Sequence, residues 1–277
     1  MLVLKRCIKK LKNLPGAVDR WSYAQGLRSA HHLALPDFLG IGAQKSGTSW
    51  LAENLRLHPE IFVSDEKEVH YFDRGYHRSL RYYASHFAKA GGRVKGEITP
   101  AYAILDPKMI RFIQKLMPDL RLIYIIRNPV ERAWSQACMN LVSIPGRAFD
   151  EVGRNEFIDH FRSPRSVLRG DYQQCVDNWL DCFSEDQLLI EFFEDIARQP
   201  QQLLERVFDH LHVSQPVDWG LFPLNEKVFA GDTEPMPSEF REILADMYAG
   251  EMAALHQRFG EKTSTWQIPD RSTGTSS

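Results

Sequence analysis

A short apolar stretch that leads through a glycine-containing loop into a helical pattern constrains this chain more than any other feature. Residues 37–42 predict a buried strand, residues 48–57 predict a helix, and Gly42 and Gly47 bracket the loop between them. Glycines at this spacing let backbone N–H groups converge on an oxyanion at the amino end of the next helix. The sequence therefore predicts a strand–loop–helix unit that binds phosphate.

Strand and helix patterns alternate along the rest of the chain. Further strands are expected at 94–97, 120–126 and 187–192, and further helices at 106–117, 129–140, 171–183, 201–211 and 238–259. Residues 143–169 have little periodicity and predict an irregular, charge-rich insertion. The alternation is typical of an α/β fold in which helices flank a parallel sheet. We expect a single domain at 37–262, a basic arm at 1–36 and a polar tail at 263–277.

Composition excludes several classes of protein. The 277 residues are 43% hydrophobic and 25% charged, as in ordinary globular proteins. A net charge of −2 argues against a surface for duplex nucleic acid. Four cysteines without a C-x-x-C pair predict neither a zinc site nor a disulfide scaffold. No apolar run is long enough for a membrane helix and no secretory signal is expected, so we expect a cytoplasmic protein.

The amino-terminal arm is basic and weakly amphipathic. Its cations alternate with apolar residues at helical spacing: Lys5, Arg6, Lys9, Lys10 and Lys12, with Leu4, Ile8 and Leu11. One short amphipathic segment binds membranes weakly, so the pattern favours a solvated arm or one packed on its own domain. Weak peripheral contact with an anionic membrane face is the alternative.

Two positions distinguish the loop from that of a nucleoside triphosphatase. Thr48 stands directly after the second glycine, where such an enzyme carries a lysine, and Lys45 lies inside the loop. The strand at 120–126 is followed by Arg127, where a magnesium-dependent enzyme usually has aspartate. A cation there binds phosphate directly and disfavours a metal. The fold is therefore expected to be a P-loop-type parallel sheet, without a metal site.

Several segments resemble those of sulfotransferases that use 3′-phosphoadenosine 5′-phosphosulfate (PAPS). Residues 44–50 resemble the 5′-phosphosulfate loop, and residues 127–135 resemble the 3′-phosphate segment of that family. Residues 68–73 and 97–102 are similar to the heparan-sulfate and carbohydrate branch, while 170–172 and 225–231 match more weakly. The resemblance covers about 37–259 and suggests a bacterial-type member that stays in the cytoplasm.

The resemblance implies a binding set for PAPS, the expected sulfuryl donor. Lys45 would stabilise the bridging oxygen of the leaving phosphate, and Arg127 and Ser135 would hold the 3′-phosphate. The complete implied set is Lys45, Ser46, Gly47, Thr48, Ser49, Trp50, Arg127, Ser135, Lys227, Phe229 and Gly231.

The catalytic base has two candidates. Glu68 is favoured because the saccharide branch has the same Glu-x-His pattern with glutamate as base, and a carboxylate can take a proton from a hydroxyl or an amine. His70 is the rival, since histidine titrates near neutral pH and is the base of the small-molecule branch. The implied acceptor-binding residues are Lys67, Asp73, Arg74, Thr99 and Tyr102.

Two departures from the heparan-sulfate enzymes bear on the acceptor. Ile98 stands where they often carry lysine, which weakens the case for a highly sulfated polymer. No cysteine follows Cys182, so the disulfide common near the late loop of secreted members has no counterpart. The sequence predicts sulfuryl transfer to a saccharide or glycolipid hydroxyl or amine. The alternatives are a small-molecule alcohol acceptor with His70 as base, a P-loop kinase, and a nucleotide-binding protein without activity.

Overall fold

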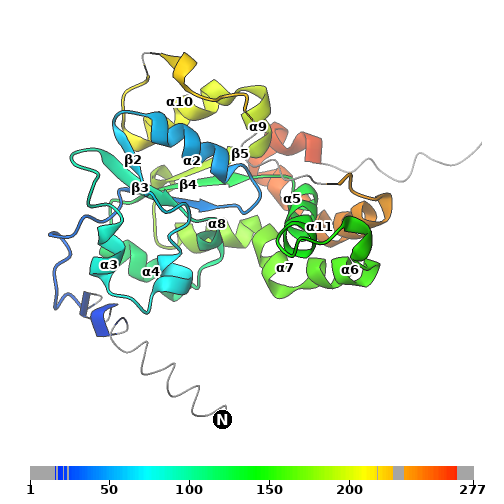
Figure 1. Ribbon diagram of the computed structural model, residues 1–277, viewed down its shortest axis with the longest axis horizontal. Helices are drawn as coiled ribbons and strands as arrows, with labels where there is room; N and C mark the ends of the chain where they lie inside the picture. The colour runs from blue at the N-terminus through cyan, green and yellow to red at the C-terminus, as the bar shows by residue number, and fades with distance from the viewer. Residues whose placement is uncertain are drawn as a thin grey trace, which may run out of the picture. The chain divides into compact units, whose positions relative to one another are not determined.

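A five-stranded parallel sheet forms the centre of the fold in the computed structural model, which describes residues 16, 18–20, 22–23, 25–216, 218–226 and 234–266 (Figure 1). The strand order is β2-β3-β1-β4-β5, and every pairing is parallel. The strands are β1 Phe38–Gly42, β2 Ile61–Val63, β3 Val94–Ile98, β4 Arg121–Ile126 and β5 Leu188–Phe192. The expected α/β architecture is confirmed. The short β2 is the one strand that the apolar pattern did not predict.

Helices flank both faces of this sheet (Figure 1). They are α2 Thr48–Leu57, α3 Leu80–Ser85, α4 Pro107–Leu116, α8 Tyr172–Leu180, α9 Phe193–Arg198 and α10 Pro200–Leu211. Local signals explain their starts: the Asp106 side chain accepts a hydrogen bond from the backbone N–H of Lys108, and Pro107 fixes the first helical residue of α4. α2 begins and ends where the sequence predicts.

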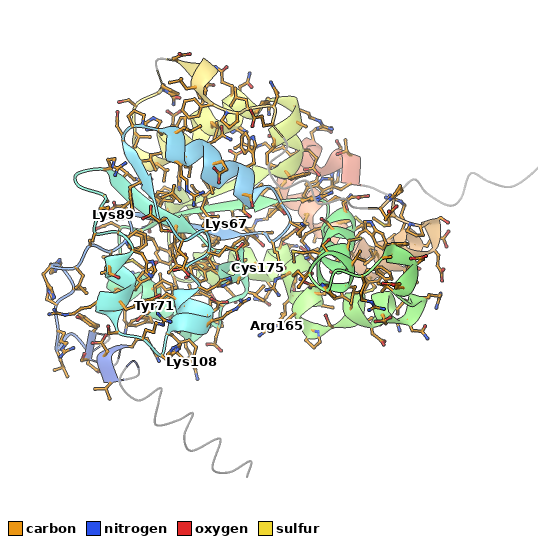
Figure 2. All side chains as sticks on the ribbon, in the orientation of Figure 1. Lys67, Tyr71, Lys89, Lys108, Arg165 and Cys175 are labelled. Carbon is orange, nitrogen blue, oxygen red and sulfur yellow. The ribbon has the colours of Figure 1, made fainter. Side chains whose placement is uncertain are left out.

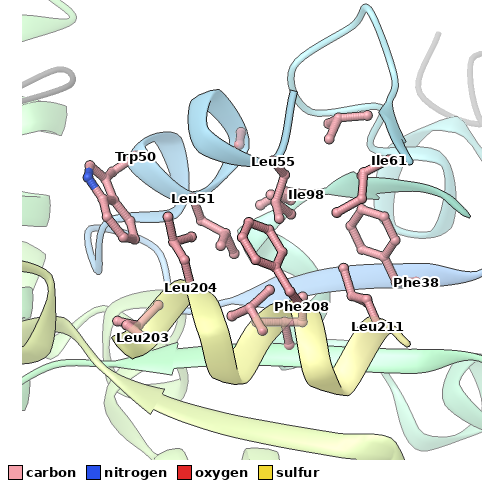
Figure 3. Packing of buried hydrophobic residues seen from close by; sticks show 14 of the residues in the cluster. Phe38, Trp50, Leu51, Leu55, Ile61, Ile98, Leu203, Leu204, Phe208 and Leu211 are labelled. Carbon is pink, nitrogen blue, oxygen red and sulfur yellow. The ribbon is translucent and has the colours of Figure 1, made fainter. Parts of the chain in front are cut away.

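The main core lies between the sheet and the pair α2 and α10 (Figure 3). Phe38 and Ile98 project from the sheet, and Leu51, Leu55 and Phe208 meet them from the helices; all five are at most 3% exposed. Each fully buried side chain of this size contributes about 1.5–3 kcal/mol to stability. The core therefore fixes α2, and with it the glycine loop, against β1.

The described residues cluster into two compact units. One comprises 1–126 and 176–229 and contains the sheet; the other comprises 127–175 and 230–277 and is helical. The helices of the second unit are α5 Pro129–Cys138, α6 Arg154–Arg162, α7 Pro164–Gly170 and α11 Ser238–Phe259, which the 3-10 helix Gly260–Trp266 follows. In its core the Trp134 ring stacks on Phe157 and Phe240, with centroids 5.3 and 5.6 Å away.

The prediction of an irregular insertion at 143–169 is wrong, because α6 and α7 occupy most of it. Glu156 caps the start of α6 by accepting a hydrogen bond from the Gly153 N–H, and it pairs with Arg147 at 2.8 Å. Phe157 and Phe161, one helical turn apart, are buried. The charged residues Arg154, Glu156, Asp159 and Arg162 around these apolar positions obscured the helical period in the sequence.

The strand order makes β1 and β4 neighbours in the sheet. The chain moves from β1 to β2 and β3 on one side, and then crosses to β4 and β5 on the other. The carboxyl ends of β1 and β4 are neighbours, since the Ala43 N–H donates to the Ile125 carbonyl at 2.7 Å. In such sheets ligands bind at the point where the strand order reverses. The glycine loop follows β1, and Arg127 follows β4 along the chain.

Part of the basic arm lies within the described residues and is bonded to its own domain. Asp19 accepts a hydrogen bond of 2.7 Å from the Leu80 N–H, and Arg20 donates to the Tyr76 carbonyl. The basic residues 5–12 lie outside the described residues. Among the helices that are described, none combines the length and the apolar character needed to cross a membrane.

Candidate active site

The glycine loop has a backbone that demands glycine at its end. Gly47 has a φ of +78°, in the left-handed region, and lies next to α9: a Cβ there would stand 2.2 Å from Ile196 Cδ1 and 3.2 Å from the Phe193 ring. Lys45 is also left-handed, with a φ of +72°. These two turns curl the loop over the amino end of α2.

The amino end of α2 is suited to bind an anion through its backbone N–H groups. Gly47 is the N-cap and supplies no side-chain cap, and the first turn contains no acidic residue. Ser46 is fully buried, and among the described residues its Oγ has no hydrogen-bond partner. A buried hydroxyl without a partner is costly in free energy. A phosphate oxygen would satisfy both this hydroxyl and the helix N–H groups, so the residues fit a 5′-phosphate.

The remaining predicted residues of this segment differ in exposure. Thr48 is 9% exposed and Ser49 is half-buried, at the first turn of α2. Trp50 is 3% exposed, belongs to the main core, and donates its indole N–H to the Leu224 carbonyl at 3.1 Å. Its ring therefore anchors α2 through packing, which leaves its backbone as the part nearest the loop.

The helix α5, which follows β4, starts at a side-chain N-cap. The Asn128 side chain accepts hydrogen bonds from the N–H groups of Val130 and Glu131, at 2.9 and 3.4 Å. Arg127 precedes this cap, and Ser135 lies further along α5 with 6% of its surface exposed. Arg127 and Ser135 belong to the helical unit. Their joint role toward a 3′-phosphate stays a prediction.

Three of the predicted residues form one charged cluster. His70 Nε2 lies 2.9 Å from Glu68 Oε2, and its Nδ1 lies 3.0 Å from Asp73 Oδ2. The hydrogen bond with Asp73, and then that with Glu68, raises the pKa of His70 from 6.5 to about 9 against the opposing effect of burial. At neutral pH the ring is therefore an imidazolium that donates from both nitrogens. Figure 2 labels Lys67, which directly precedes Glu68, and Tyr71, which directly follows His70.

The other predicted acceptor residues divide into exposed and buried pairs. Lys67 and Arg74 are exposed, beside the cluster in sequence. Thr99 and Tyr102 have no exposed surface, and both donate their hydroxyls to Glu97, at 2.6 and 3.0 Å. Their side chains thus act within the protein interior. Lys227, Phe229 and Gly231 lie outside the described residues.

Glu97 is the residue that sequence reasoning missed. It is fully buried in β3, and burial raises its pKa against the opposing effect of its hydrogen bonds. The signal in the sequence was a glutamate inside the strand expected at 94–97, followed by Thr99 and Tyr102. Within the described residues, no group of three or more His, Cys, Asp or Glu side chains is arranged to hold a metal ion.

Comparison with known proteins identifies the family. Residues 35–219 match the family described as "Sulfotransferase domain". This chain belongs to the sulfotransferase family. It is 34% identical over 185 residues to heparan sulfate glucosamine 3-O-sulfotransferase 6 of Mus musculus; the match covers 66% of this chain and 54% of that protein. The sulfotransferase chain thus spans about half the length of that curated relative.

Solved structures of sulfotransferases have the same fold. A sulfotransferase from Alicyclobacillus acidocaldarius superposes with a TM-score of 0.67 at 28% identity, covering 85% of this chain and 100% of that chain. Mouse sulfotransferase SULT7A1, complexed with PAP, has a TM-score of 0.52 at 16% identity over 83% of this chain and 88% of that chain. The second likeness concerns the fold alone.

Proposed function

We propose that this protein transfers the sulfuryl group of PAPS to a hydroxyl or amine of a saccharide or glycolipid. The observation that carries the proposal is the charged cluster of Glu68, His70 and Asp73, on a chain whose glycine loop fits a phosphate. The heparan sulfate relative supports a saccharide acceptor, and the PAP complex of a protein with the same fold supports the donor.

The proposed reaction is an in-line displacement at sulfur. The acceptor oxygen or nitrogen forms a bond to sulfur while the bond from sulfur to the bridging phosphate oxygen breaks, and 3′,5′-adenosine bisphosphate leaves with that electron pair. Glu68 takes the proton of the acceptor. Lys45 stabilises the charge that grows on the bridging oxygen, and Ser46, with the first N–H groups of α2, holds the 5′-phosphate.

The charge state of His70 favours Glu68 as the base. An imidazolium has no lone pair with which to accept a proton, and the pKa of His70 is raised to about 9. His70 is better suited to orient Glu68 and to donate a hydrogen bond. The small-molecule alternative, with His70 as base, would need the neutral ring, which is the minor form at pH 7.

The test measures transfer of labelled sulfate from PAPS to a panel of saccharides, glycolipids and small alcohols. Glu68→Gln keeps the shape of the side chain but cannot accept a proton, so we expect turnover to fall roughly a hundredfold with nucleotide binding retained. His70→Ala should cost less. An active Glu68→Gln beside an inactive His70→Ala would assign the base to His70. Transfer to the small alcohols alone would overturn the saccharide class.

Location and membrane contact are also proposals. Among the described residues, Cys138, Cys175 and Cys182 form no disulfide, which is consistent with a reducing cytoplasm. The basic arm offers a weak electrostatic attraction to an anionic membrane face. Co-sedimentation with anionic vesicles, comparing the full chain with one whose five lysines and arginines at 5–12 are replaced, tests the contact. Equal sedimentation of the two would reject it.

A further inference from the structure

The carboxylate of Glu97 accepts hydrogen bonds from four neutral donors in the interior. Its Oε2 accepts from the Thr99 hydroxyl at 2.6 Å and from the Val69 N–H at 3.3 Å. Its Oε1 accepts from the hydroxyls of Tyr83 and Tyr102, at 2.8 and 3.0 Å. Two oxygens that each accept twice use all four acceptor positions of a carboxylate, and these hydrogen bonds oppose the larger effect of burial, which raises its pKa.

Two of these hydroxyls also accept hydrogen bonds from backbone N–H groups in the segment 69–72. The Thr99 oxygen accepts from the His70 N–H at 3.4 Å. The Tyr102 oxygen accepts from the N–H groups of Tyr71 and Phe72, at 2.8 and 3.4 Å. Together with Val69, four consecutive backbone N–H groups are held either by Glu97 or by a hydroxyl that donates to Glu97.

Residues 69–72 lie in the chain between the two carboxylates of the charged cluster. Glu68 precedes it and Asp73 follows it, and both reach the His70 ring. His70 has a φ of +53°, a left-handed conformation that is unfavourable for a residue with a Cβ. Such a backbone persists when its surroundings determine it. The hydrogen bonds at residues 69–72 supply that constraint, and the turn brings carboxylates from both sides onto one ring.

We propose that Glu97 is a positioning residue for the active site: through Thr99 and Tyr102, its carboxyl group fixes the backbone turn that assembles Glu68, His70 and Asp73. Its effect on turnover rests on the proposed sulfuryl transfer, whereas its effect on the geometry of the cluster does not. Glutamate is required because a glutamine amide has a single acceptor oxygen, and its NH₂ group would face two donors.

The experiment follows the His70 imidazole by NMR during a pH titration, with the signal assigned from a His70→Gln variant. In Glu97→Gln we expect the pKa of His70 to fall from about 9 by one unit or more, because the loosened turn no longer holds both carboxylates against the ring. Turnover should fall at least tenfold while the stabilisation by 3′,5′-adenosine bisphosphate stays unchanged.

The matched control is Glu191→Gln. Glu191 is also a buried glutamate in a strand, 1% exposed, but it pairs with Arg206 at 2.6 Å. This variant loses stability without moving the pKa of His70. The groups that face the ring, Glu68, Asp73 and Arg74, are the same in both variants.

A folded Glu97→Gln protein whose His70 still titrates near 9 would overturn the proposal. Should Glu97→Gln fail to fold, Thr99→Val decides, because it keeps the volume but removes the hydroxyl between His70 and Glu97. A lowered pKa of His70 supports the proposal there, and an unchanged one rejects it. Wild-type protein that transfers no sulfuryl group would refute the proposed function, while the titration would still test the role of Glu97.

Discussion

Among single residues, the proposed chemistry uses charges that stand on left-handed backbone positions. Lys45 and His70 both adopt left-handed conformations, and each carries a cation that the proposed reaction uses. In each case a side chain predicted from the sequence is held by a turn of the backbone. Two predictions belong to these residues.

Replacing Lys45 removes the cation assigned to the leaving group. We expect Lys45→Ala to lower turnover by a hundredfold or more, since one preorganised charge-stabilising group contributes on the order of 3 kcal/mol to a barrier. Steady-state kinetics with PAPS measure the effect. Lys89→Ala is the control, because Lys89 is an exposed lysine paired with Asp65 at 2.7 Å. Near-wild-type turnover in a folded Lys45→Ala protein would contradict the role of Lys45 at the leaving group.

The raised pKa of His70 makes stability depend on pH. The charged form is favoured in the folded state, so this contribution is complete below pH 6.5 and is lost as the pH rises through about 9. We expect a loss on the order of 2 kcal/mol, after allowance for solvent screening of a partly exposed group. Urea unfolding between pH 6 and 10 should show a slope that His70→Gln reduces.

The control for this slope is His210→Gln. Burial lowers the pKa of His210 to about 4, so this residue is neutral above pH 6.5 in both the folded and the unfolded state. It should leave the alkaline slope unchanged. An alkaline slope that is the same in wild type and His70→Gln would contradict the ion-paired imidazolium.

At the scale of elements, the strand–loop–helix unit works because three elements converge on it. β1 leads into the loop, α2 presents its amino end, and α9 packs against Gly47 through Ile196 and Phe193. The close approach of α9 leaves no room for a side chain at the position where the backbone turns.

We expect Gly47→Ala to destabilise the fold by more than the roughly 1–2 kcal/mol that a left-handed alanine costs, because Ile196 must also move. Urea unfolding measures the change. Gly91→Ala is the matched control: Gly91 has a φ of +63°, with nothing within 4 Å of its Cβ position. Equal losses in the two variants would show that Ile196 is not crowded, and an Ile196→Ala background should recover the excess.

At the scale of the whole molecule, binding of a nucleotide should appear as global stability. A ligand at a hundred times its Kd adds about 2.7 kcal/mol. We expect 3′,5′-adenosine bisphosphate to raise Tm by several degrees with EDTA present, because Lys45 and the helix N–H groups supply the positive charge that a metal gives elsewhere. ATP with Mg²⁺ should raise Tm less. A rise that requires Mg²⁺ would contradict the metal-free donor site.

Arg127→Ala serves as the selectivity control for that measurement. It should weaken the effect of 3′,5′-adenosine bisphosphate but leave that of adenosine 5′-phosphosulfate, which lacks the 3′-phosphate, nearly unchanged. Arg121→Ala, at the opposite end of β4, should alter neither. Equal losses for both nucleotides would show that Arg127 has a structural role.

The elements that could be predicted from the sequence are those whose formation depends on neighbouring residues in the chain. Apolar patterns predicted α2, β4 and α11 closely, and Asp106 with Pro107 predicted the start of α4, because an apolar period and a capping residue act within one turn or strand. The proximity of Glu68 and His70 could likewise be predicted, since the two residues are close in the chain.

The contacts between residues far apart in the chain became known from the folded structure. Glu97 of β3 contacts the segment at 69–72, and α9 packs against Gly47. The helices α6 and α7 form in a stretch whose many charged residues obscured the helical period. These contacts join residues many positions apart, and their free energy comes from burial and hydrogen bonding that exist only once the sheet has formed. The four donors that surround the Glu97 carboxyl group come together only in the folded protein.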